Sequence, residues 1–92
     1  MRDMATLTFA RAFRRHVECP DASAAGATVG DVLDGYFATH PQVRTYVLDD
    51  TGAVRRHITL FVGDEQLDHV RGLTTPVNDA DTIAVYQALS GG

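Results

Sequence analysis

The sequence predicts an α+β domain in which a mixed β-sheet of four to five strands wraps around one helix. Two observations carry this prediction. Apolar residues alternate with polar ones in several short runs, as is typical of half-buried strands. One stretch in the first half of the chain instead places its apolar residues at helical spacing. With 92 residues, the chain is long enough for one core and one domain.

The N-terminal segment predicts two strands joined by a loop. Ala5–Ala10 alternates and is expected to be the first strand. The basic segment 11–16 is predicted to be a polar turn, either solvated or available to an acidic partner. Residues 17–24 are expected to return as a strand, which Pro20 confines to an edge of the sheet. Cys19, the single cysteine, is expected to be a small, semi-buried apolar residue.

The helix is predicted from its cap and its apolar stripe. The Thr28 hydroxyl can accept a hydrogen bond from an early helical N–H group. Five apolar residues follow at i, i+3, i+4, i+7 and i+8, namely Val29, Val32, Leu33, Tyr36 and Phe37. Pro41 ends the helix at about His40. The stripe is expected to face the core, because a helix of this length needs tertiary burial to be stable.

The connection after the helix is expected to pack beneath the domain, with room for a short helical turn. Its apolar residues are Val43, Tyr46, Val47 and Leu48. Asp49–Gly52 then has the composition of a turn.

The last two long strands are predicted to share an open face. In the run 58–62, Thr59 and Phe61 alternate with inward apolar residues. In the final strand, which begins at residue 81, Ala84 and Tyr86 lie on the face opposite to Ile83 and Val85. A short strand at 66–67 lies between these runs. The resulting order (strand, strand, helix, strand, short strand, strand) is a β-grasp layout.

Composition and motifs exclude several functions. The net charge is −4 and the basic residues are scattered, which does not fit a nucleic-acid-binding protein. The apolar runs are too short to span a bilayer, so a cytoplasmic protein without membrane association is expected. The four histidines lack metal-site spacing, and no nucleophile or phosphate-binding motif is present. The chain is therefore expected to bind no metal or cofactor and not to be an enzyme.

The C-terminal Gly91 and Gly92 carry the functional hypothesis. Residues 1–88 are expected to form the domain and residues 89–92 a flexible tail. A Gly-Gly terminus fits a narrow channel, but its carboxylate must be activated, for example as an acyl-adenylate, before sulfur can be transferred to it. All eight basic residues are arginines, so the chain has no side-chain amine to acylate and would be the donor. If only the Gly-Gly dipeptide is considered, a frayed chain end explains the two glycines as well as a functional tail does.

The C-terminal stretch 73–92 resembles the signature of the MoaD/ThiS family of ubiquitin-like sulfur carriers. The residues that carry the resemblance are Thr75-Pro76-Val77, Asn78-Asp79-Ala80-Asp81, Ile83-Ala84-Val85 and Ser90-Gly91-Gly92. The resemblance implies a ubiquitin-like β-grasp fold. It also implies that a ubiquitin-activating-type enzyme adenylates Gly92 with ATP, and that sulfur from a sulfurtransferase converts Gly92 to a thiocarboxylate.

The same resemblance implies two binding regions. Partners would recognise the tail through Leu89, Ser90 and Gly91. The apolar surface that the family presents to its activating enzyme would consist of Thr59, Phe61, Ala84 and Tyr86. An aromatic pair at this position would also be explained if Phe61 and Tyr86 simply cover the sheet.

Two segments favour the CysO-like subgroup, which supplies sulfur for cysteine biosynthesis, or a carrier for secondary metabolism. They are Val62-Gly63-Asp64-Glu65 and Arg71-Gly72-Leu73. The acceptor enzyme would then be a cysteine synthase or a related enzyme. Three alternatives remain at this point. The chain could be the small subunit of molybdopterin synthase, acting with the large subunit in molybdenum cofactor biosynthesis, a ubiquitin-like protein modifier, or a non-covalent adaptor.

Overall fold

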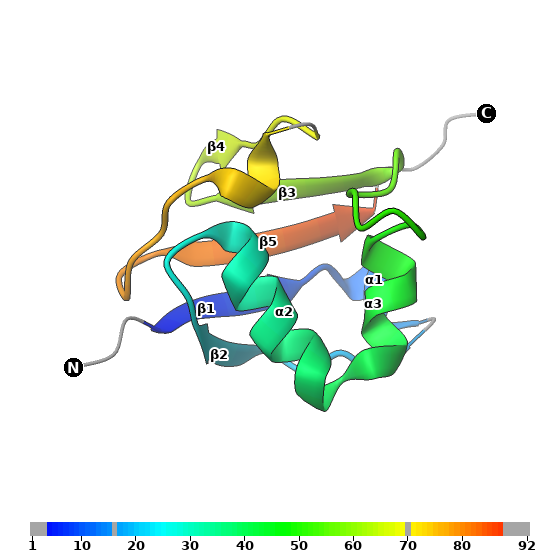
Figure 1. Cartoon of the computed structure of the whole chain (residues 1–92). Helices are drawn as coiled ribbons and strands as arrows, with labels where there is room; N and C mark the ends of the chain where they lie inside the picture. Colours follow the sequence, from blue (N-terminus) through cyan, green and yellow to red (C-terminus); the bar gives the residue numbers. More distant parts are fainter. Residues whose placement is uncertain (1–3, 16, 70, 88–92) are drawn as a thin grey trace.

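The computed structural model describes residues 4–15, 17–69 and 71–87, which form one sheet covered by helices on one face (Figure 1). The strands are β1 (Met4–Phe9), β2 (Ala22–Ala25), β3 (Ile58–Val62), β4 (Glu65–Gln66) and β5 (Thr82–Gln87). The helices are α1 (Arg11–Arg14), α2 (Val29–Thr39), α3 (Pro41–Val47) and a 3-10 helix, η1 (Gly72–Thr74).

The sheet has the strand order β2-β1-β5-β3-β4. β1 and β5 are parallel neighbours at its centre, and the other pairs are antiparallel. Phe9 is level with Val85, and Ile58 is level with Gln87. β1 and β5 therefore finish at the end of the sheet where β3 begins, which we call the exit end. This topology, with α2 packed across the sheet, confirms the predicted β-grasp fold.

The core forms between α2 and the inner face of the sheet, as the two periodicities predict. Thr28 Oγ1 accepts a hydrogen bond from the Asp31 amide at 3.2 Å, so the predicted N-cap is present. All five residues of the helical stripe are buried. They meet the buried side chains of the three long strands: Ala5, Leu7, Phe9, Ile58, Leu60, Ile83 and Val85.

The N-terminal connection differs from the predicted polar turn. It contains α1, whose Phe13 is only 2% exposed and lies 5.5 Å from the Phe9 ring, measured between ring centroids. β2 is shorter than predicted and begins after Pro20. Pro20 has no amide hydrogen for a strand ladder, and its carbonyl accepts a hydrogen bond from Tyr36 instead. The predicted strand over 17–24 is therefore wrong over residues 17–21 and correct over 22–24.

The connection after α2 is helical, and α3 buries Val43 and Val47. Leu48 is also buried, as expected. Tyr46, which was predicted to pack beneath the domain, is instead 42% exposed. Val43 and Val47 are four residues apart and share the inner face, and Tyr46, about 100° from Val47 around the helix, lies at the edge of this face.

Because of Tyr36, the free energy of unfolding is expected to change with pH in the alkaline range. Its side chain is buried, and its hydroxyl donates to the Pro20 carbonyl at 2.8 Å. Burial raises the pKa of Tyr36 from 10.0 to about 12, because the tyrosinate anion would lose hydration. The unfolded chain therefore ionises first. The free energy of unfolding should fall as the pH rises from 10.0 towards about 12.

The Tyr36→Phe variant tests this expectation by urea unfolding at neutral pH and at two pH values in that alkaline window. At neutral pH the variant should lose about 1 kcal/mol, the typical contribution of one hydrogen bond. Its stability should then decline less steeply than that of the wild type as the pH rises. Parallel declines in the two proteins would show that Tyr36 is not the responsible group.

Candidate functional site

The outer face of the sheet carries an apolar patch formed by Thr59, Phe61, Ala84 and Tyr86, which we call the aromatic patch. In the β3–β5 register, Thr59 is level with Tyr86 and Phe61 with Ala84. The two aromatic rings therefore meet on a diagonal, with centroids 5.4 Å apart and planes at 79°. This edge-to-face arrangement is a favourable one for aromatic side chains. The structure thus brings together the four residues predicted to share the open face.

The aromatic patch is open because the helices cover only the other side. Figure 1 shows α2 and α3 in front of the sheet, and the alternation of β3 and β5 directs the patch residues away from them. Tyr86 is 48% exposed. The patch lines an open depression of about 590 Å³ that also includes Gly63, Asp64 and Gln66. An exposed apolar surface with a polar rim is typical of protein–protein contact sites.

β5 leads from the aromatic patch towards the predicted tail. Its last residue, Gln87, pairs with Ile58 at the exit end. The predicted recognition residues Leu89, Ser90 and Gly91, and the predicted modified residue Gly92, lie outside the described residues, as does the predicted domain boundary. Their roles stay predictions. Residues 88–92 follow Gln87 in the sequence, and a fully extended segment of five residues spans at most roughly 17 Å.

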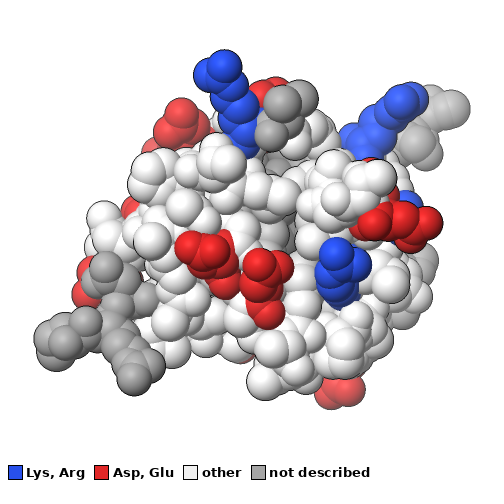
Figure 2. Space-filling model, viewed as in Figure 1, with Lys and Arg blue, Asp and Glu red and all other residues white. Residues whose placement is uncertain are grey.

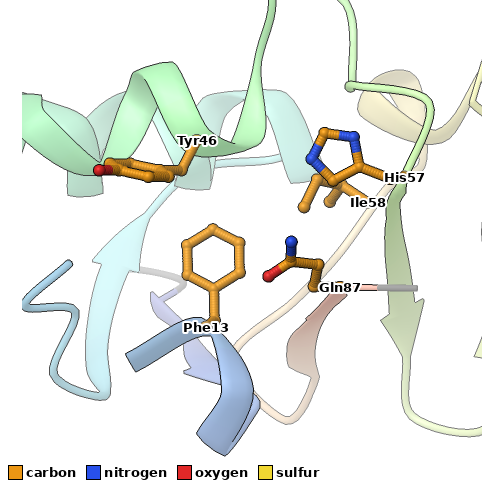
Figure 3. Close-up of a pocket in the computed structure, with 5 residues that line it drawn as sticks. All are labelled: Phe13, Tyr46, His57, Ile58 and Gln87. Atoms are coloured by element: carbon orange, nitrogen blue, oxygen red, sulfur yellow. The ribbon is translucent and has the colours of Figure 1, made fainter. Parts of the chain in front are cut away.

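A second pocket lies at the exit end, and the sequence reasoning did not find it. We call it the exit pocket. It encloses about 240 Å³ and is lined by Phe13, Tyr46, His57, Ile58 and Gln87 (Figure 3). The sequence does not predict it, because Phe13 falls in the expected polar turn and Tyr46 is expected in the interior. The available signal was Phe13 itself, an aromatic residue within an otherwise basic segment and four residues after Phe9.

Three titratable side chains of the described residues, those of Cys19, His40 and His69, make structural contacts. Within the described ranges, no three histidine, cysteine or acidic side chains are grouped as a metal site would require. His40 stacks on Tyr36 with centroids 4.3 Å apart, and His69 Nε2 lies 2.6 Å from the Ile58 carbonyl oxygen. Cys19 is fully buried, and burial raises the pKa of its thiol despite an opposing effect of Arg14. A protonated, buried thiol is a poor nucleophile.

Surface charge gives no large patch of one sign on the helix-covered face. Figure 2 shows acidic and basic side chains intermixed there, with uncharged surface between them. Such a surface lacks the continuous basic stripe that binding to a nucleic-acid backbone requires. Among the described residues, no helix combines the length and apolar character needed to cross a membrane.

A β-grasp domain with an apolar patch beside its last strand is the architecture of a ubiquitin-like protein. The chain belongs to the ThiS family, whose model matches residues 10–92. The predicted family resemblance is therefore confirmed.

Known relatives are sulfur carriers and protein modifiers. Small archaeal modifier protein 3 of Haloferax volcanii is 30% identical over 66 residues, covering 72% of this chain and 71% of that protein. Sulfur carrier protein CysO of Mycobacterium tuberculosis is 29% identical over 72 residues, covering 76% and 77%. A crystal structure of the Amycolatopsis orientalis BexX/CysO complex matches with a TM-score of 0.77 and 28% identity, covering 96% of this chain and 99% of the matched chain. These names describe carriers and modifiers, not catalysts.

Proposed function

We propose that this protein is a sulfur carrier whose C-terminal Gly92 is converted to a thiocarboxylate. The observation that carries the proposal is the family match, which extends through Gly91 and Gly92. The sulfur would serve cysteine, cofactor or secondary-metabolite biosynthesis. Similarity to CysO proteins favours a cysteine synthase or a related enzyme as the acceptor.

The proposed chemistry takes place on a partner enzyme. A ubiquitin-activating-type enzyme joins the Gly92 carboxylate to the AMP moiety of ATP and releases pyrophosphate. A hydrosulfide equivalent, supplied through a sulfurtransferase, then attacks the carbonyl carbon and expels AMP. The activation is needed because a free carboxylate is a poor acyl donor, whereas AMP is a good leaving group. The carrier contributes recognition and a terminus without side-chain obstruction.

The position of the aromatic patch supports a mechanism in which the carrier is recognised and the partner enzyme performs the chemistry. Phe61 and Tyr86 are on the outer face of the sheet, and the chain continues from Tyr86 towards Gly92. An enzyme that docks on the patch would have the terminus within the reach of a short extended segment. Binding energy from the patch would hold the carboxylate near ATP and favour the reaction through proximity. We therefore propose the aromatic patch as the docking surface for the activating enzyme.

Intact-mass analysis tests the sulfur-carrier proposal directly. The protein is incubated with its adenylating enzyme, ATP and a sulfide source, with one control lacking ATP. We expect the complete reaction to show the mass increase of one sulfur replacing one oxygen, and fragmentation to locate it at Gly92. An unchanged mass in the presence of an enzyme that consumes ATP on a known carrier would refute the proposal.

A second candidate is a protein modifier that forms isopeptide bonds with lysines of other proteins. The similarity to small archaeal modifier protein 3 favours this alternative. The same adenylate would then be attacked by a lysine amine. Because the chain has no lysine of its own, it could not form lysine-linked chains with itself. Proteomic detection of lysines carrying a remnant of this C-terminus, lost on deletion of the gene, would support conjugation.

A further inference from the structure

The exit pocket has an apolar floor and an open mouth. Phe13 and Ile58 are almost fully buried and form the floor, and the partly exposed Tyr46 stands beside Phe13 with ring centroids 6.2 Å apart. Figure 3 shows the side chains of His57 and Gln87 facing this space from the start of β3 and the end of β5. Its volume of about 240 Å³ is sufficient for one large apolar side chain.

The exit pocket and the aromatic patch lie on opposite sides of the same strand. Tyr86 belongs to the patch and its neighbour Gln87 to the pocket. Successive residues of a strand point to opposite faces. An enzyme that holds the chain beyond Gln87 is therefore beside both surfaces, and can use the pocket as a second anchoring point.

Arginines are concentrated in two segments at the exit end of the sheet. Five arginines come from the two segments that border the exit pocket, namely Arg11, Arg14, Arg15, Arg55 and Arg56. Acidic residues occur at both ends: Asp64, Glu65, Asp79 and Asp81 lie at the opposite end, and Asp49 and Asp50 lie in the connection that leads to Arg55 and Arg56. The five arginines outnumber these two aspartates at the exit end.

Three of these arginines are available to a partner. Arg14 forms an ion pair with Asp21, and Arg55 Nε donates to the Thr45 carbonyl at 2.7 Å. Arg11, Arg15 and Arg56 are exposed and make no ion pair within the part of the chain that the structure describes. The charge around the pocket therefore complements an acidic surface.

We propose that the exit pocket receives a large apolar side chain from an acidic segment of the adenylating enzyme, while the aromatic patch contacts the same enzyme across β5. This inference rests on the proposed function for the identity of the partner. The pocket would bind the apolar side chain, and the arginines would pair with the acidic residues on either side of it in the enzyme segment. The enzyme thereby contacts both faces of the sheet at the exit end, and this contact directs the C-terminus into its nucleotide site.

Two variants with matched controls test the assignment. His57→Trp fills the pocket from an exposed position at its mouth, and Ala38→Trp adds the same side chain at an exposed position on α2. Arg56→Glu reverses one charge beside the pocket, and Arg71→Glu makes the same change at an exposed residue outside the two pocket segments. Thermal unfolding establishes that all four variants are folded. The readouts are enzyme binding without ATP and the KM for the carrier in ATP–pyrophosphate exchange.

His57→Trp should weaken binding and raise KM at least tenfold or so, as expected for loss of a buried anchor. Arg56→Glu should weaken binding several-fold at low ionic strength and approach the wild type at high salt, because rim charges are screened. Ala38→Trp and Arg71→Glu should behave as the wild type.

If the wild type supports ATP–pyrophosphate exchange, and His57→Trp and Arg56→Glu have the same enzyme binding and KM as the wild type, this inference is overturned. The proposed function would remain intact. Absence of exchange by the wild type would overturn both. NMR shifts at Tyr46 and Gln87 that depend on the concentration of this protein without the enzyme would assign the pocket to a second copy. Shifts at Phe13 and Tyr46, which are distant from the C-terminus in sequence, on removal of 89–92 would assign it to the chain's own tail. Either result would overturn the assignment to the enzyme.

Discussion

Deleting Gly91 and Gly92 is expected to abolish thiocarboxylate formation while leaving the free energy of unfolding unchanged. The activating enzyme would then meet the carboxylate of Ser90, whose side chain obstructs a channel suited to glycine, on a chain two residues shorter. Stability should be retained because the buried core of the described residues lies between Ala5 and Val85. Intact mass after reaction and urea unfolding give the two readouts.

The matched control removes Arg2 and Asp3, two residues from the other end of the chain. This variant should be converted to the thiocarboxylate as efficiently as the wild type. Efficient sulfur incorporation into the variant ending at Ser90 would show that the glycines are dispensable. A non-covalent adaptor makes the opposite prediction, namely full biological function after the deletion. The comparison therefore separates the covalent and non-covalent hypotheses.

Replacing Phe61 and Tyr86 by alanine is expected to raise the KM for the carrier by roughly 100-fold, because two central aromatic anchors of an interface each contribute about tenfold or more. The maximal rate should change less, since Gly92 and the tail are intact. The pair forms the aromatic centre of an open depression with its rings in edge-to-face contact. ATP–pyrophosphate exchange at varied carrier concentration separates KM from kcat.

Met4→Ala provides a control for this variant, because Met4 is an exposed apolar residue of β1 outside the aromatic patch. It should leave KM unchanged. Thermal unfolding should show that the Phe61→Ala/Tyr86→Ala protein is folded, which is expected because Tyr86 is 48% exposed. An unaltered KM would show that the pair only covers the sheet, the alternative reading of these residues.

The aromatic patch was predictable because it depends on period-two alternation in two strands. Once Ile58 and Leu60 face the core, Thr59 and Phe61 must face outward, and the same rule applies to Ala84 and Tyr86 in β5. The position of the two strands as neighbours followed from the β-grasp order. No long-range information beyond the order of elements was needed.

The exit pocket was not predictable in the same way, because its five residues come from four separate segments. Phe13 is buried by contacts with Phe9 and Tyr46, neither of which determines the local conformation of the basic segment. The direction of Tyr46 depends on α3 being a regular helix rather than a loose connector. Periodicity in a seven-residue segment after a proline is too short to establish this.

The sequence by itself determined the elements whose apolar residues repeat over a full helix or strand, together with the terminal glycines on which the proposed chemistry depends. α2, the inner faces of β1, β3 and β5, and the aromatic patch belong to this group. Only the tertiary structure decided where β2 begins, how α1 packs, and how Gln87 comes to border a pocket with Phe13 and Tyr46. The physical reason is that local periodicity specifies which side of an element is buried, whereas contacts between distant segments specify what lies at its ends.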